Sequence, residues 1–89
     1  MVDKIYKVVW TPKALKMLKQ IDKTIGRDLY KTANEDLSKD PFNNGIPLSA
    51  NYKGIWKYKY GRGYRVLYEI FKEEIIVNVL ETWPREHGY

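Results

Sequence analysis

Hydrophobic and polar positions alternate near the start of the chain and then change to a helical period. Residues 5–10 alternate and are rich in β-branched and aromatic types, which predicts a strand. Thr11 can cap a helix with its hydroxyl, and Pro12 suits the first helical position, where its missing N–H is no loss. Apolar residues then recur at helical spacing over residues 14–21, and every four residues over residues 25–37. The pattern therefore predicts two short helices, which we expect to form an antiparallel pair.

The second half of the chain has the pattern of a sheet. Residues 41–54 are dense in Pro, Asn and Gly and predict a loop. Three alternating or apolar runs follow, and each predicts a strand; they span residues 55–60, 64–71 and 75–82. The last run is the most apolar and is expected to be a central strand. The loop at residues 61–63, with a glycine at each end, predicts a tight hairpin between the first two runs.

Together these elements predict a single α+β domain over residues 1–89, in the order β-α-α-β-β-β. We expect two antiparallel helices packed on one face of a mainly antiparallel four-stranded sheet. Trp56 and Tyr58 alternate in phase with Val66 and Ile70 on the next strand. We therefore expect both aromatic residues in the core.

Composition limits the chemistry that is available. The chain has no cysteine and one histidine, which excludes disulfides, thiolate metal sites and His-rich metal sites. The sequence shows no carboxylate cluster suited to Mg²⁺, so we expect neither a metal nor another cofactor. The longest uncharged run falls far short of the roughly 18–20 apolar residues of a membrane helix, and charges interrupt the N-terminus where a signal peptide is apolar. We therefore expect a cytoplasmic protein with no membrane partner.

The net charge of +5 on 89 residues is large for so small a surface. It suits an anionic partner such as nucleic acid, a ribonucleoprotein or an acidic protein. It equally fits a basic protein with no such partner. Net charge alone does not decide between these two interpretations.

The predicted hairpin brings several cations together. If its loop is symmetric, Lys59 faces Arg65 across the ladder, and Lys57 lies two residues away on the same face. Like charges opposite each other destabilise a sheet, so we interpret the set as an anion site with phosphate as its natural guest. The alternative is a solvated face on which the long side chains splay apart. Glu69 and Glu81 are expected on the same side. Either could act as a base, and the default interpretation is that both neutralise Arg65.

The tail adds three further candidates, Arg85, His87 and Tyr89. Each has an ordinary explanation alone, but a tail folded back over the sheet would add a cation, an imidazole and a ring that stacks on a base. That inventory fits RNA cleavage, in which a 2′-hydroxyl attacks its own phosphodiester, cations stabilise the phosphorane and a proton reaches the leaving 5′-oxygen. The general base stays open between Lys59, whose neutral form is favoured by neighbouring cations, and His87, which titrates near neutrality.

The order of elements and three segments resemble the RelE/ParE superfamily of bacterial type II toxins. The segments YKVVWTPKALKMLKQID, GIWKYKYGRGYRVLYEI and VLETWPREHGY are similar to the family's first strand and helix, its central hairpin, and its last strand with a basic tail. The resemblance covers nearly the whole chain and favours the RelE branch. It implies a toxin that a RelB-like antitoxin neutralises. In that branch it also implies a metal-independent, ribosome-dependent endoribonuclease, or mRNA interferase, which cleaves A-site mRNA and halts translation.

The resemblance also assigns roles by position. Lys57 and Lys59 match paired strand lysines proposed as base and transition-state stabilisers, and Arg65 matches a phosphate-contacting arginine. Arg85 matches a tail arginine that stabilises or protonates the leaving group, and Tyr89 a closing tyrosine that stacks on or orients the nucleotide.

Some positions depart from this pattern or extend it. His87 resembles the near-terminal histidine of YoeB-like relatives, as do Asn51, Gly54 and Trp56 in the pattern N-x-x-G-x-W. However, Ile46 stands where that subgroup carries Glu. Catalysis of a mixed lysine and histidine type therefore stays open.

Two other functions stay open. The ParE branch shares the fold but inhibits DNA gyrase, and it generally lacks the full cationic set. A non-catalytic module that binds nucleic acid or protein is the third interpretation. Trp83 fits the core, an antitoxin contact or a ribosome contact.

Overall fold

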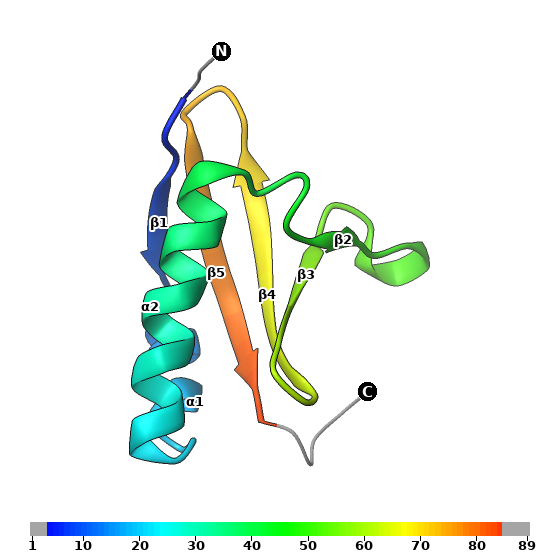
Figure 1. Ribbon diagram of the computed structural model, residues 1–89. Coiled ribbons are helices and arrows are strands. Elements are labelled where there is room, and N and C mark those ends of the chain that lie inside the picture. The colour runs from blue at the N-terminus through cyan, green and yellow to red at the C-terminus, as the bar shows by residue number, and fades with distance from the viewer. Residues whose placement is uncertain (1–3, 85–89) are drawn as a thin grey trace.

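A computed structural model of the chain describes residues 4–84. In it, a pair of helices lies on one face of a twisted sheet (Figure 1). The elements in chain order are β1 (Lys7–Trp10), α1 (Pro12–Leu18), α2 (Lys23–Lys39), β2 (Ile46–Pro47), the 3₁₀ helix η1 (Ala50–Tyr52), β3 (Trp56–Tyr60), β4 (Tyr64–Phe71) and β5 (Ile76–Trp83).

The two helices begin at side-chain caps. The Thr11 hydroxyl accepts the N–H of Ala14 at 3.1 Å, and Pro12 occupies the first turn, both as predicted. Asp22 caps α2 through its carboxylate, which accepts the N–H groups of Thr24 and Ile25. The helix therefore begins at Lys23, two residues before the apolar repeat that starts at residue 25. The first helix is also shorter than predicted, because the chain tightens into a turn after Leu18.

The sheet has the strand order β1-β5-β4-β3-β2. Every neighbouring pair is antiparallel except β1 and β5, which run parallel. This confirms the α+β class, the mainly antiparallel sheet and the inner position of the last strand. The predicted count of four strands was one short, because Ile46 and Pro47 pair with β3 as an edge strand of two residues. Two residues are too few to show a period of their own.

The core lies between the helices and the covered face of the sheet. Tyr58 is only 5% exposed and Trp56 packs against the same cluster, which confirms the prediction for both. The sheet contributes Val66, Tyr68, Val77 and Val79, and the helices contribute Ala14, Leu29, Ala33 and Leu37.

A β-bulge in β5 decides which side chains near its end face the core. Tyr68 pairs with Val79, but Leu67 pairs with Glu81, so Leu80 is an extra residue in the ladder. One extra residue exchanges the two faces for everything beyond it. Thr82 consequently pairs with Val66 on the covered face, is fully buried, and donates its hydroxyl to the Ala14 carbonyl at 3.2 Å. Glu81 is placed on the open face.

Two buried tyrosines are expected to make the fold less stable in alkali. The Tyr58 hydroxyl donates to Asp36 at 2.6 Å, and the Tyr68 hydroxyl donates to the Pro41 carbonyl at 2.7 Å. Burial raises the pKa of both phenols well above the ordinary value, and the bond to Asp36 raises that of Tyr58 further. Because the folded state favours the protonated phenols, their contribution is complete below the unfolded pKa of about 10 and falls as the pH rises through it.

We therefore expect the free energy of unfolding, measured by urea titration, to be lower at pH about 11 than at pH about 8. Replacing both tyrosines, Tyr58→Phe with Tyr68→Phe, should reduce this difference. A difference of the same size in the double variant would assign the alkaline loss to other groups.

Candidate functional site

The open face of the sheet carries three cations on two neighbouring strands. Lys59 pairs directly with Arg65, as predicted from the symmetric hairpin, and Lys57 lies two residues before Lys59 on the same face. Neighbouring strands lie about 4.8 Å apart, so the three charges share one small surface. Lys57, Lys59 and Arg65 are called the cationic strip below.

The hairpin loop fixes the register of the strip. Gly61 and Gly63 have positive φ angles of 56° and 95°, which residues with a Cβ rarely adopt. These conformations allow a three-residue loop to join β3 and β4 with Tyr60 opposite Tyr64. A slip of one residue would move the cations to the covered face, so the glycines hold the strip on the open side.

The strip is partly embedded rather than fully solvated. Lys59 is exposed, but Lys57 and Arg65 are half-buried, and the Nη1 atom of Arg65 is buried. Leu67 lies on the same face between Lys57 and Glu81, and it is only 5% exposed. Leu67 is therefore covered on the face that carries the cations. This packing disfavours a face on which the cations merely splay into water.

A depression of about 160 Å³ opens beside the two lysines. It is lined by Asn43, Asn44, Gly45, Ile46, Lys57 and Lys59. Asn43 is held by Asp40, and its hydrogen bonds to that carboxylate lower the pKa of Asp40 below its usual range. Asn44 donates to the Asp36 carbonyl at 2.9 Å. The loop after α2 thus supplies a fixed wall, and the depression has room for a small anion next to two ammonium groups.

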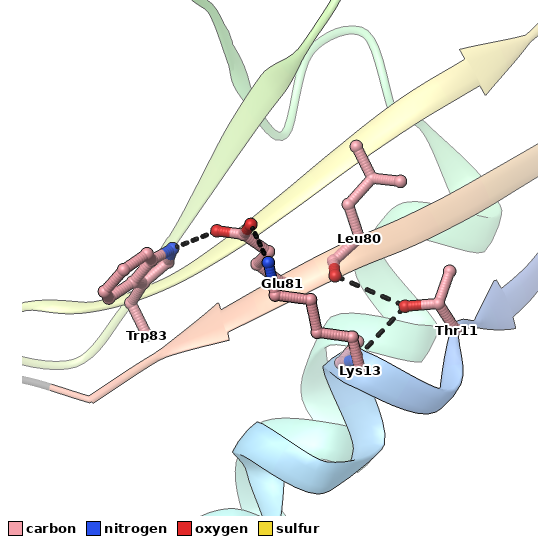
Figure 2. A network of polar contacts seen from close by, with 6 residues as sticks. Thr11, Lys13, Leu80, Glu81 and Trp83 are labelled. Carbon is pink, nitrogen blue, oxygen red and sulfur yellow. Dashed lines mark hydrogen bonds and ion pairs between the residues drawn. The ribbon is translucent and has the colours of Figure 1, made fainter.

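Glu81 lies on the open face, as expected. Its hydrogen-bond partners there include Lys13 and Trp83, which the sequence did not predict. The Lys13 ammonium donates to Oε2 and the Trp83 indole donates to Oε1, both at 2.8 Å (Figure 2). Lys13 comes from the first turn of α1, which runs beside the end of β5. Trp83 pairs with Arg65 in the ladder, so an aromatic side chain adjoins the cationic strip.

Half of the predicted site residues fall within the described part of the chain. Lys57, Lys59 and Arg65 are brought together, whereas the predicted positions 85, 87 and 89 lie outside residues 4–84. The last described residues leave β5 beside Arg65. The roles of Arg85, His87 and Tyr89 stay predictions.

Among residues 4–84, no three His, Asp or Glu side chains are grouped to hold a metal ion. Neither described helix has the length and hydropathy to cross a membrane.

A second concave surface lies between the two helices. This interhelical groove has a volume of about 510 Å³ and is lined by Leu15, Leu18, Lys19, Lys23, Gly26, Arg27 and Tyr30. Its floor is apolar and three cations stand on its rim. It belongs to the helical layer, on the side of the sheet opposite the cationic strip.

Comparison with known proteins identifies the class. Residues 8–89 match the family model described as ParE toxin of the type II toxin-antitoxin system parDE. The toxin-antitoxin complex RelBE2 from Mycobacterium tuberculosis matches with 31% identity and a TM-score of 0.83, over 88% of this chain and 95% of that chain. The intact E. coli RelBE complex matches with 25% identity and a TM-score of 0.66, over 86% of this chain and 93% of that chain.

A YoeB/ParE toxin from Agrobacterium tumefaciens shares the fold, with 18% identity and a TM-score of 0.69 over 85% of this chain and 94% of that chain. Comparison with curated proteins finds no match. The fold and its matches thus define a toxin of a type II toxin-antitoxin system. The chain belongs to the ParE toxin family within the RelE/ParE superfamily, which confirms the resemblance found in the sequence.

Proposed function

We propose that this toxin is a ribosome-dependent endoribonuclease that cleaves mRNA in the A site and halts translation in the cytoplasm. The observation that carries the proposal is the ladder pairing of Lys59 with Arg65, with Lys57 on the same face. A sheet that keeps cations opposed at a cost in stability is explained by an anionic substrate that they bind. The partly buried setting of Lys57 and Arg65 strengthens their attraction for a phosphate.

The reaction that fits this strip needs no metal. The 2′-oxygen bonds to the adjacent phosphorus and the bond from phosphorus to the 5′-oxygen breaks, which leaves a 2′,3′-cyclic phosphate and a 5′-hydroxyl. A general base, Lys59 or His87, takes the 2′ proton, and Arg85 stabilises or protonates the leaving oxygen. Lys57 and Arg65 stabilise the charge that builds on the phosphorane. Tyr89 stacks on or orients the nucleotide.

Induction of the toxin without an antitoxin tests the class of activity. We expect growth to stop, with incorporation of labelled amino acids failing before incorporation of labelled thymidine. Failure of replication first would overturn the proposal. Continued growth with folded toxin present would instead favour a non-catalytic binding module.

A gyrase inhibitor is the second candidate, and the match to the ParE family model favours it. It predicts DNA damage and an intact message in the same cells. The cationic strip argues for the nuclease, because Lys57, Lys59 and Arg65 share one small surface, as the binding of a phosphate group requires.

We further propose that a cognate antitoxin neutralises this chain, as the RelBE complexes among its structural relatives suggest. The interhelical groove fits an amphipathic antitoxin segment, whose apolar side would cover the floor and whose acidic side would face Lys19, Lys23 and Arg27.

Leu15→Glu tests this docking surface. Leu15 is 37% exposed and lines the groove, so a carboxylate there should meet the acidic segment and weaken antitoxin binding by about tenfold or more. Gln20→Glu makes the same charge change at an exposed position away from the groove lining. Isothermal titration should separate the two variants, while mRNA cleavage stays equal in both. Equal antitoxin affinity in the two variants would place the antitoxin elsewhere.

A further inference from the structure

Trp83 lies beside the cationic strip on the open face of the sheet. It pairs with Arg65 on β4, and Arg65 pairs in turn with Lys59 on β3. One row across three strands therefore reads lysine, arginine, tryptophan, with neighbours about 4.8 Å apart. Trp83 is half-buried.

The indole is held in place by a brace that uses both oxygens of Glu81. Oε1 accepts the indole N–H at 2.8 Å, and Oε2 accepts the Lys13 ammonium at 2.8 Å (Figure 2). Glu81 is two residues before Trp83, so both side chains stand on the same face of β5. Lys13 is exposed, whereas the Glu81 side chain is only 24% exposed. The ring is thus anchored at its polar edge by a carboxylate that is itself fixed from α1.

The bulge at Leu80 creates this arrangement. If Leu80 paired with Leu67 in a regular ladder, Glu81 and Trp83 would point to the covered face and Thr82 to the open one. β-Bulges that change the direction of side chains are common beside active sites. Here it places an aromatic ring and its brace on the side that carries the cations, and the buried Thr82 hydroxyl secures that register from below through Ala14.

We propose that Trp83 is a stacking platform for a nucleobase of the RNA whose phosphate the cationic strip binds, and that Lys13 and Glu81 are its positioning residues. The proposal rests on the proposed nuclease function for its substrate class. A single nucleotide carries its phosphate and base far enough apart to contact Arg65 and Trp83 together. Base stacking on an aromatic side chain is tolerant of sequence, so the platform orients the scissile nucleotide without reading it.

The surroundings favour a nucleotide over a protein segment. A protein hot spot places tryptophan at the centre of an apolar, desolvated patch. Trp83 instead has Arg65 across the ladder and the Glu81–Lys13 pair at its indole N–H. A ring among charges suits a ligand that joins an anion to a π surface, and single-stranded RNA is such a ligand.

The test uses the full chain labelled with 5-fluorotryptophan, which gives three ¹⁹F resonances, one for each tryptophan. Trp83→Phe assigns the resonance of interest. The probe is a short 2′-O-methyl RNA, which cannot be cleaved because the attacking hydroxyl is blocked. Its control is an abasic oligonucleotide with the same number of phosphates. We expect the Trp83 resonance to shift with the base-containing probe and to respond much less to the abasic one, while the resonances of the core residues Trp10 and Trp56 move little.

Affinities complete the test. The dissociation constant of the abasic probe divided by that of the base-containing probe is a ratio that isolates the contribution of the bases. Trp83→Leu should reduce that ratio by about tenfold, and Trp83→Phe should retain most of it. Glu81→Ala should tighten binding of the abasic probe, because it removes a negative charge. It should also lower the ratio, because the Trp83 indole loses the hydrogen bond that holds it. Lys13→Ala should lower the ratio to a smaller extent, with Lys16→Ala as the matched control on α1. A purely structural role for the brace would leave the ratio unchanged.

The outcomes separate this inference from the nuclease proposal. A ratio that is the same in the wild type and Trp83→Leu, in protein that cleaves mRNA normally, would overturn the platform and leave the nuclease intact. A base-dependent shift of Trp83 in protein that leaves mRNA uncut would support the platform and overturn the nuclease. A Trp83 resonance that ignores RNA and responds only to the antitoxin would make Trp83 a protein contact and overturn the inference.

Discussion

Lys59→Gln is expected to reduce mRNA cleavage on ribosomes by about 100-fold or more while leaving the protein at least as stable as the wild type. The loss follows because the variant removes a positive charge and a candidate general base from the site of phosphorane formation. Stability is expected to stay constant or to rise by up to about 1 kcal/mol, because Lys59 is exposed and faces another cation, Arg65, across the ladder.

The combination of lower activity and unchanged or higher stability is the informative result. Lys72→Gln serves as the matched control, since it removes one exposed lysine from the turn between β4 and β5, outside the strip. It should cleave at the wild-type rate. Arg65→Ala should also abolish cleavage while the protein stays folded. Wild-type cleavage by Lys59→Gln would remove the strip from the reaction.

Thr82→Glu is expected to have the largest effect on stability. Thr82 pairs with Val66 on the covered face, where it is fully buried and donates its hydroxyl to the Ala14 carbonyl. An unpaired carboxylate at that position should lower the free energy of unfolding by more than about 3 kcal/mol. Much of the stability of so small a domain would be lost.

Two further variants identify the cause of that loss. Thr82→Val keeps the size of the side chain, removes only the hydroxyl and should cost about 1–2 kcal/mol. Leu80→Glu places the same carboxylate at the half-buried extra residue of the bulge and should cost less than Thr82→Glu. Denaturant titration followed by circular dichroism measures all three. If Thr82→Glu were as stable as Leu80→Glu, the register at the end of β5 would not be set by burial.

The sequence predicted those features whose causes are local. The Thr11–Pro12 start, the helical spacing of apolar residues and the glycines at 61 and 63 each act within a few residues. They were enough to predict the order of elements and the opposition of Lys59 to Arg65. The prediction of three cations on one face rests on the same short hairpin.

Other features arise from contacts between distant parts of the chain. The edge strand β2 exists because two loop residues meet β3, and they carry no pattern of their own. The bulge results from competition between Thr82 and Glu81 for the buried position against α1, and alternation alone cannot show which residue is skipped. The Lys13–Glu81–Trp83 brace depends on that bulge and joins residues 68 positions apart. No spacing rule could have indicated it.

Purified ribosomes loaded with a defined mRNA test the central claim most directly. The wild-type chain, added without antitoxin, should cut the message within the A-site codon and leave a 2′,3′-cyclic phosphate on the upstream fragment, with no cleavage of the same RNA free in solution. A message that stays intact on the ribosome, beside purified gyrase that loses its activity with the same preparation, would contradict the nuclease and assign the chain to gyrase inhibition.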